Sequence, residues 1–278
     1  MNKQLFDIVI VGSGPIGSST AYFLTQKSKK KKIILITQDP TDDRTATYMY
    51  AGGNIQWNWW QHEPIKAEMT QITANFINKL IDKGIDLSSR RDYYLWFDEG
   101  QMIPALNVSG SKLVKYFIDQ AVKRGLIYKF STMLEKIVEE DGLYKLSTNK
   151  GDFLAKKVLL AVGPNINKFL PKAKVGFEKR VLNVLDTPIT KERLNFPHVI
   201  LPWKDGWVFL FLKKIGDETK LIFGQEDIIE YSSKWEEENY FNKFKKDLTQ
   251  LMPFLKNAKV EKVLWGFDAT NKTLKIYE

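Results

Sequence analysis

Asp7-Ile-Val-Ile-Val-Gly-Ser-Gly-Pro-Ile-Gly-Ser-Ser-Thr-Ala-Tyr-Phe23 is the stretch that decides the fold of this chain. Ile8–Val11 forms a continuous apolar, β-branched run, which is typical of a strand buried on both faces. Gly12, Gly14 and Gly17 follow directly in the spacing G-x-G-x-x-G. A helical pattern begins after the last glycine. A strand, a glycine loop and a helix in this order predict a site for the phosphates of a dinucleotide.

Each glycine of the loop has a separate physical role. Gly12 allows the tight turn after the strand, Gly14 lets a pyrophosphate approach the backbone, and Gly17 lets the helix pack closely on the strand. The N-terminus of the helix adds free N–H groups and the positive end of its dipole. Apolar side chains of the helix are available to pack on the sheet, namely Ala21, Phe23 and Leu24.

The composition narrows the chemistry. The 278 residues are enough for one large domain or two interlocked domains. The chain has no cysteine, which excludes disulfides, thiolate nucleophiles and cysteine-ligated metals. Its two histidines, His62 and His198, are too few for a histidine-rich zinc site and argue against a Ser-His-Asp triad. We therefore expect no metal site, assign no catalytic residue, and expect a bound cofactor to perform the chemistry.

The net charge of +9 is concentrated in part between Lys27 and Lys32. This lysine run is either an anion-attracting patch or a solvated loop, and we favour the loop because no aromatic interleaving or nucleic-acid motif accompanies it. No nucleic-acid partner is expected. No apolar run approaches the length of a membrane span, and the N-terminus leads directly into a strand, so we expect a cytoplasmic protein.

The pattern after the glycine loop alternates between helices and strands. Ile33–Thr37 is predicted as the second strand, which completes a βαβ unit. A helix follows from Pro64 to Gly84, with one apolar face formed by Ile65, Met69, Ile72, Phe76 and Leu80. Further helices are predicted at 111–123 and 235–251. Strands are predicted at 93–97, in a meander of 127–130, 134–139 and 144–148, at 158–162, in an antiparallel sheet of 181–188, 207–213 and 220–224, and at 260–265 and 273–277.

Four stretches in this order give the chain a resemblance to a known family. They are Gly12–Gly17, Ala51–Asn54, Val108–Val114 and Lys157–Gly163. Their order and spacing resemble those of the FAD-dependent oxidoreductases of the D-amino acid oxidase, glycine oxidase and sarcosine oxidase superfamily, and the similarity spans almost the whole chain. The resemblance implies FAD as the cofactor.

The resemblance also implies an α/β fold in which a Rossmann-like FAD-binding domain is interwoven with a mostly antiparallel α+β substrate domain. We place the FAD-binding domain at residues 1–84, 111–170 and 262–278, and the substrate domain at 85–110 and 171–261. The family continues with a strand, a glycine-rich turn and a helix that cover the flavin, and this segment is missing after Glu278. We therefore expect a shortened or split flavoprotein, a second chain that completes the flavin site, or a chain that no longer binds FAD productively.

Carried over to this sequence, the resemblance places the FAD pyrophosphate on the glycine loop and further cofactor contacts along the chain. The implied cofactor-binding residues are Gly12, Gly14, Pro15, Ile16, Gly17, Thr37, Gln38, Asp39, Arg44, Thr45, Gly52, Gly53, Asn54, Met133, Leu134, Ala161 and Gly163. The family usually has an acidic residue at the end of the second strand for the adenosine ribose. Thr37 stands there in this chain, with Asp39 two positions later, so these residues either bind the ribose or form only a strand end and turn.

The substrate wall is the second part of the implied site. Trp59 and Trp60 follow the flavin-facing loop, and either line the ring and substrate cavity or pack between the domains. Trp207 lies in the predicted substrate sheet and either lines the substrate wall or packs in the core, and the core is favoured. Asp268 stands where amino acid oxidases of this type hold the substrate carboxylate with an arginine. A carboxylate at this position either suits a cationic amine or has no role at the site.

These observations lead to a functional hypothesis. We expect an FAD-dependent oxidoreductase that oxidises a C–N bond of a small amine or amino acid by hydride transfer to flavin N5. The alternatives are another flavin-dependent oxidation, or a non-catalytic or split FAD-binding subunit that needs a partner chain.

Overall fold

The computed structural model of the chain describes residues 4–28, 30–40, 53–55, 63–89, 93–96, 101–189, 198–203, 206–215, 218–226 and 240–269. It divides into two compact units, each made of separate segments of the chain. Unit 1 comprises Met1–Met49, Gly110–Phe177 and Ala269–Glu278, and unit 2 comprises Tyr50–Ser109 and Glu178–Asp268. The chain therefore enters unit 2 and returns to unit 1 more than once.

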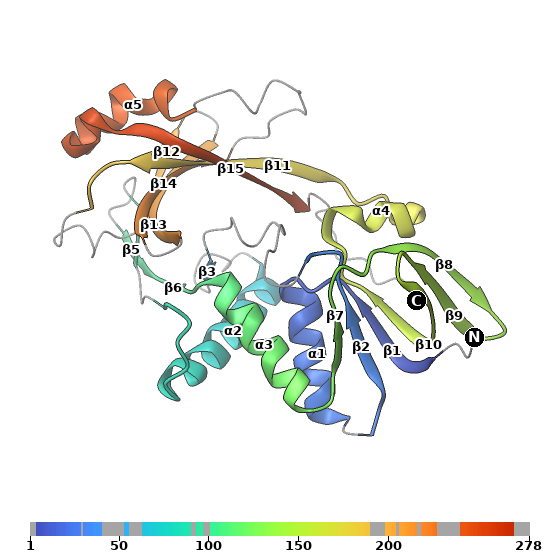
Figure 1. The fold of residues 1–278 in the computed structure, drawn as a ribbon. Helices are drawn as coiled ribbons and strands as arrows, with labels where there is room; N and C mark the ends of the chain where they lie inside the picture. The colour runs from blue at the N-terminus through green and yellow to red at the C-terminus, as the bar shows by residue number, and fades with distance from the viewer. Residues whose placement is uncertain are drawn as a thin grey trace. The chain divides into compact units, whose positions relative to one another are not determined.

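Unit 1 is built on a six-stranded sheet with the strand order β7-β2-β1-β10-β9-β8 (Figure 1). Four neighbouring strands run parallel: β7 (Ile127–Lys129), β2 (Ile33–Ile36), β1 (Leu5–Val11) and β10 (Gly151–Leu160). The two strands at the other edge, β9 (Leu143–Thr148) and β8 (Leu134–Glu140), are antiparallel to their neighbours. Because β1, β2 and β10 run parallel, their carboxyl ends lie next to one another at the same end of the sheet.

The predicted meander is partly wrong. Strands β8 and β9 do form an antiparallel pair, but β7 lies at the opposite edge, parallel to β2. Parallel strands need a crossover rather than a hairpin, and helix α3 (Gly110–Lys123) immediately precedes β7 along the chain. The strand predicted at 158–162 is the end of the longer β10.

Helices α1 (Pro15–Lys27) and α3 pack side by side against one face of this sheet (Figure 1). The shared core contains Ala21 of α1 and residues of α3, β1 and β2, namely Val114, Ile118, Ala121, Ile8, Ile10, Ile33 and Leu35. Between the helices, the rings of Tyr22 and Phe117 lie 5.2 Å apart. Phe23, which the sequence predicts to face the sheet, is instead 41% exposed, because Tyr22 occupies the buried position toward α3.

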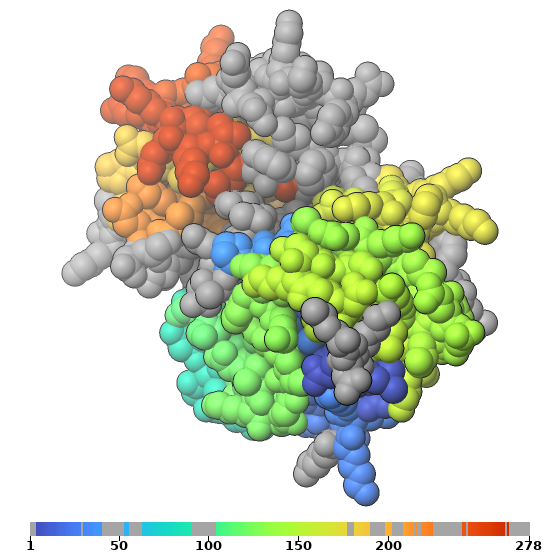
Figure 2. Space-filling model, turned by 45° about the vertical axis from the view of Figure 1, so that its right-hand side comes forward, coloured from blue at the N-terminus to red at the C-terminus, as the bar shows by residue number. Residues whose placement is uncertain are grey.

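The opposite face of the sheet has its own core. Val9 and Val11 of β1 and Ile34 and Ile36 of β2 share it with Leu134 and Leu146 of the antiparallel strands. β1 is thus buried on both faces, as its apolar sequence predicts. Figure 2 shows the green segments of α3 and the strands after it gathered around the blue N-terminal segments of the same unit. Short helical turns follow β10: η2 (Gly163–Asn165), α4 (Ile166–Phe169) and η3 (Pro171–Ala173).

Unit 2 is built on a seven-stranded, mostly antiparallel sheet with the order β15-β11-β14-β13-β12-β4-β5 (Figure 1). Only β12 and β4 pair in parallel among its described registers. The strand bounds are β4 Tyr93–Trp96, β5 Gln101–Pro104, β11 Phe177–Asp186, β12 His198–Trp203, β13 Gly206–Ile215, β14 Glu218–Glu226 and β15 Lys259–Ala269. A separate two-stranded ribbon joins β3 (Asn54–Ile55) to β6 (Leu106–Asn107).

Helix α5 (Tyr240–Leu251) covers one face of this sheet, and η5 (Pro253–Asn257) follows it. Phe241, Phe244 and Leu248 pack on alternate residues of the strands, including Val208 and Leu210. The side-chain oxygen of the buried Asn183 accepts a hydrogen bond of 2.9 Å from the backbone N–H of Phe241, so that the sheet itself satisfies a donor in the first turn of the helix. Residues 235–239 of the predicted helix and the predicted strand 273–277 lie outside the described residues.

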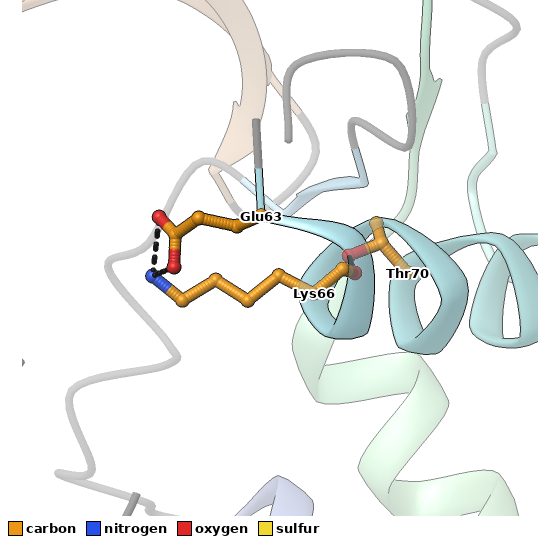
Figure 3. Close-up of polar contacts among 3 residues, drawn as sticks. All are labelled: Glu63, Lys66 and Thr70. Atoms are coloured by element: carbon orange, nitrogen blue, oxygen red, sulfur yellow. Dashed lines mark hydrogen bonds and ion pairs between the residues drawn. The ribbon is translucent and has the colours of Figure 1, made fainter. Parts of the chain in front are cut away.

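Helix α2 (Pro64–Asp82) differs from its prediction in two ways. It belongs to unit 2, where it contacts β3, whereas the sequence places residues 1–84 in the FAD-binding domain. Its buried residues are Ala74, Ile77 and Leu80, and the predicted apolar positions Ile65, Met69 and Ile72 are 59–70% exposed. The first turns carry polar contacts: the Nζ of Lys66 pairs with the Glu63 carboxylate at 2.7 Å, and Thr70 donates to the Lys66 carbonyl (Figure 3).

The helices of the described part of the chain do not include one that is long and apolar enough to cross a membrane.

Candidate functional site

The glycine loop follows β1, which lies in the middle of the parallel part of the sheet in unit 1. The connection through α1 leads to β2 on one side of β1, whereas β10 lies on its other side. The N–H of Gly12 donates to the carbonyl of Ile36 at 2.9 Å, and the N–H of Ala161 donates to the carbonyl of Val11 at 2.8 Å. The carboxyl ends of three strands are therefore tied together around this loop. Such a point is the usual location of a nucleotide crevice in an open parallel sheet.

Two glycines of the loop have no room for a side chain. Gly12 has a φ of +100°, and a Cβ there would collide with the carbonyl oxygen of Ala161. A Cβ on Gly17 would collide with the carbonyl oxygen of Gly12. Because both obstacles are backbone atoms, they cannot rotate away as a side chain can. The structure thus requires glycine at both positions, in agreement with the roles inferred from the sequence.

The N-terminus of α1 opens from this loop without a side-chain cap. Gly14 is the N-cap residue and Pro15 occupies the first helical position. The helical hydrogen bonds begin with the N–H of Ser18, which donates to the carbonyl of Gly14 at 2.9 Å. The first turn contains no acidic residue. Backbone N–H groups and the positive end of the helix dipole are thus available to an anion, and these features fit the pyrophosphate of a dinucleotide. The neighbouring Ile16 is 69% exposed.

The end of β2 forms a well-bonded turn. The N–H of Asp39 donates to the Thr37 hydroxyl oxygen at 3.3 Å, and the carbonyls of Thr37 and Asp39 accept from Thr132 and Ser131. Thr37 and Asp39 are buried, whereas Gln38 between them is exposed. These contacts match the strand-end interpretation, and ribose binding by these residues stays a prediction.

The predicted adenine-binding segment already has internal partners. The N–H of Met133 donates to Oδ1 of Asn149 at 2.8 Å, and its carbonyl accepts from the N–H of Asn149 at 3.3 Å. The Met133 side chain is 41% exposed, while Leu134 is buried. An adenine contact at this point would therefore use the second lone pair of the Met133 carbonyl. Gly163, at the other end of the predicted site, has a φ of +54° and open space around its Cα.

Unit 2 also contains a glycine that lies in close contact with a backbone carbonyl group. Gly53 has a φ of +69°, and a Cβ there would collide with the carbonyl oxygen of Val108. In return, the N–H of Val108 donates to the Gly53 carbonyl at 3.0 Å. The backbone of the predicted flavin-facing loop is thus held against the segment that follows β6. This close contact is possible because Gly53 has no side chain.

Asn54, the next residue of that loop, directs its amide toward a histidine that the sequence does not single out. Oδ1 of Asn54 accepts from Nδ2 of Asn107 at 2.6 Å, and Nδ2 of Asn54 lies 2.7 Å from Nδ1 of His198. Burial lowers the pKa of His198 to about 3, so the ring is neutral at physiological pH. The available signal was a lone histidine that begins an apolar strand.

A partly buried lysine in the same sheet is also absent from the predicted site. Lys213 lies on β13, two residues after Phe211, in register with Lys220 of β14. Burial lowers the pKa of Lys213 to about 8, whereas its neighbour Lys220 pairs with Glu218 and Glu261. An amine with this pKa can gain or lose a proton near neutral pH. The available signal was the position of Lys213 on β13: it lies on the same face of the strand as Phe209 and Phe211, because every second residue of a strand faces the same way.

Several predicted site residues cannot be placed. Arg44, Thr45, Gly52, Trp59 and Trp60 lie outside the described residues. Trp207 and Asp268 lie on β13 and β15, but only their backbone is described. In the described part of the chain, no group of three or more histidine, aspartate and glutamate side chains could hold a metal ion.

The fold and the glycine cradle together define a dinucleotide-binding α/β unit connected to a mostly antiparallel-sheet unit. Residues 7–107 match the family model DAO, FAD dependent oxidoreductase. Over these residues the match confirms the resemblance seen in the sequence, and FAD is the cofactor that the matched family indicates. The loop glycines and the uncapped helix N-terminus fit that cofactor.

Solved structures share this fold over nearly the whole chain. The L-proline dehydrogenase from P. horikoshii is 17% identical with a TM-score of 0.76, and the match covers 97% of this chain and 83% of that one. The glycine oxidase from Geobacillus kaustophilus is 15% identical with a TM-score of 0.71, covering 97% and 84%. The L-amino acid deaminase from Proteus vulgaris is 12% identical with a TM-score of 0.71, covering 97% and 84%.

A relative with higher sequence identity matches a shorter stretch. The FAD-dependent oxidoreductase domain-containing protein 1 of Xenopus laevis is 36% identical over 77 residues. This stretch is 27% of the present chain and 15% of the frog protein.

The backbone contact at Gly12 gives a first prediction. Gly12→Ala is expected to lower the free energy of unfolding by at least about 2 kcal/mol, because it adds a backbone collision to the strain of a positive φ. Gly142→Ala is the matched control, since Gly142 also has a positive φ but open space around it, and it should cost only about 1 kcal/mol. Urea denaturation of both variants measures the difference, and equal losses would contradict the proposed collision.

The buried histidine gives a second prediction, on the pH dependence of stability. The folded chain keeps His198 neutral down to a pKa of about 3, whereas the unfolded chain protonates it below about 6.5. The contribution of neutral His198 is thus complete above pH 6.5 and is lost as the pH falls toward 3. Between pH 7 and pH 5, the free energy of unfolding should fall by about 2 kcal/mol more in the native chain than in His198→Asn.

Urea denaturation at several pH values measures this difference. His62→Asn, which retains His198, is the control and should follow the native pH dependence. A His198→Asn variant with the same loss of stability as the native chain would show that His198 is not the responsible group.

Proposed function

We propose that this protein oxidises a C–N bond of a small amine or amino acid with FAD as its cofactor. The observation that carries the proposal is the glycine cradle at the switch point of the parallel sheet, in a chain with the fold of the three solved enzymes. Those proteins are described as a proline dehydrogenase, a glycine oxidase and an amino acid deaminase. All three descriptions concern compounds with a carbon–nitrogen bond.

The residues of the chain have a limited task in such a reaction. FAD, when bound, would supply the electron sink for a hydride from the substrate carbon. The glycine loop and the N-terminus of α1 hold the phosphates and so fix the position of the cofactor. The remaining contribution of the protein is to orient the substrate and to exclude water, and no acid or base from the chain is required if the amine binds in its neutral form.

The substrate wall is proposed to contain Trp59, Trp60, Trp207 and Asp268. Indole rings provide a large, rigid apolar surface for a small substrate. Asp268 provides a negative charge, which favours a cationic amine and disfavours a free carboxylate at the same point. Simple amines, or amino acids whose carboxylate binds elsewhere, are therefore the proposed substrate class.

The cofactor is tested by the visible absorption spectrum of the purified 278-residue chain before and after denaturation. We expect a yellow protein that releases about one FAD per chain, as a site that encloses the pyrophosphate should. A protein that is colourless and stays colourless after incubation with FAD would contradict the proposed function. Bleaching of the flavin by a panel of amines and amino acids then identifies substrates.

The charge at Asp268 gives a prediction for the same assay. Asp268→Asn should reduce the kcat/KM for amines without a carboxylate about tenfold, because it removes the partner of the ammonium group. Amino acids should lose less or gain, because the repulsion of their carboxylate is also removed. Asp186→Asn, which changes an exposed carboxylate of the same unit, is the control. Equal losses for both substrate classes would exclude Asp268 from substrate discrimination.

A further inference from the structure

Three polar side chains of unit 2 form a continuous hydrogen-bonded chain from the predicted flavin-facing loop into the sheet. Asn107 of β6 donates from Nδ2 to Oδ1 of Asn54 at 2.6 Å, and Nδ2 of Asn54 lies 2.7 Å from Nδ1 of His198. The two contacts join residues that are 53 and 144 positions apart in the sequence. Asn54 is thus connected on one side to its own ribbon and on the other side to β12.

The direction of these bonds fixes the state of the histidine ring. The Asn54 oxygen accepts from Asn107, so the Asn54 amide nitrogen faces His198 and donates to it. Nδ1 of His198 must then be the unprotonated acceptor, and the proton of the neutral ring lies on Nε2. The reversed chain, with Asn107 as the acceptor and Nδ1–H of His198 as the donor, would place the proton on the other nitrogen.

The ring itself is firmly held by the sheet. It stacks on Phe211 at a centroid distance of 4.9 Å and an interplanar angle of 26°, and it lies 6.0 Å from Phe209. Phe209 in turn occupies the space next to Gly224, where a Cβ would collide with its ring. His198 is only 6% exposed. A side chain packed in this way is a fixed point to which a loop can be attached.

At the loop end of this hydrogen-bonded series, the Asn54 side chain is bonded through both its amide oxygen and its amide nitrogen. The amide oxygen of Asn54 bonds to Asn107 and its amide nitrogen to His198, so the side chain anchors the loop on both sides. The backbone of Gly53 is held separately by the N–H of Val108. These bonds determine the path of the loop backbone, which is the part of the loop proposed to approach the cofactor.

We propose that His198 is a positioning residue for the flavin-facing loop: it accepts a hydrogen bond from Asn54 at Nδ1 and, together with Asn107, sets the path of the Gly53–Asn54 backbone beside the cofactor. This inference rests on the proposed function, because the placement of the loop beside the flavin comes from the same family resemblance as the use of FAD. His198 does not touch the reacting atoms in this proposal. It acts only through Asn54.

Matched substitutions separate the hydrogen bond from the volume of the ring. His198→Asn keeps an acceptor at the δ position, where the imidazole has Nδ1. His198→Leu places methyl groups there, and His198→Gln moves the amide one atom further out. The affinity for added FAD, measured by quenching of flavin fluorescence, should fall about tenfold in the leucine and glutamine variants and less than about threefold in the asparagine variant. Asn107→Leu should resemble His198→Leu.

A purely structural role gives a different pattern. Leucine is well tolerated in an apolar environment, so the melting temperature of His198→Leu can equal that of the native chain while its FAD affinity falls. The visible spectrum of bound FAD should also shift in the leucine variant and return toward the native spectrum in the asparagine variant. The positioning role would be overturned if the FAD affinities and flavin spectra of the variants changed in parallel with their melting temperatures, and if His198→Asn did not recover the native values.

The direction of the hydrogen bonds is tested on the native chain itself, before any substitution. The ¹⁵N chemical shifts of the His198 ring, assigned by comparison with His198→Asn, distinguish an unprotonated Nδ1 from a protonated one. An unprotonated Nδ1, both without and with FAD, supports the proposal, and a protonated Nδ1 overturns it. This measurement remains decisive if His198→Leu fails to fold.

The outcomes also separate this proposal from the proposed function. A native chain that binds no FAD overturns the proposed function and with it the role of the loop. A native chain that binds FAD, with His198→Leu and Asn107→Leu binding it equally well and with unchanged spectra, overturns the positioning role alone.

Discussion

The close approach of backbone segments at the carboxyl end of β1 is the constraint on which unit 1 depends. Gly12 lies against the carbonyl of Ala161, and Gly17 lies against the carbonyl of Gly12, with no space for a Cβ at either position. Helix α1 can therefore start directly at the sheet, at the place where the carboxyl ends of β2 and β10 are hydrogen-bonded to the end of β1. The same close approach brings the N-terminus of α1 to the carboxyl end of β1, where the phosphates of the cofactor are predicted to bind.

Unit 2 uses a similar device with an additional polar connection. Gly53 approaches the carbonyl of Val108 as closely as the loop glycines approach theirs, and Asn54 then continues the contact through side chains. Buried polar groups are costly unless they are bonded, so a chain of bonded amides and a neutral imidazole specifies one arrangement of the loop. Backbone fit and buried hydrogen bonds therefore act together on the segment that the family resemblance assigns to the flavin.

The differences between prediction and structure arise because a local sequence pattern does not say which neighbour a side chain or strand will contact. The exposed stripe of Ile65 and Ile72 on α2 has the same helical spacing as a buried one, and the spacing alone does not say which stripe faces a neighbour. The same holds for the adjacent residues Tyr22 and Phe23 on α1: both rings lie near Phe117 of α3, but only Tyr22 is buried. For β7, a short strand of three residues carries no information about the edge it joins.

The sequence by itself determined the features that depend on neighbouring residues: the buried strand before Gly12, the glycine spacing, the helix after it, and the parallel and antiparallel character of the two sheets. The family resemblance rested on these local patterns. Tertiary structure decided the features that join distant residues, above all the contact of Asn54 with His198 across 144 positions and the burial that keeps that ring neutral. The physical reason is that steric and periodic constraints act within a few residues, whereas hydrogen bonding and desolvation depend on what the completed fold brings together.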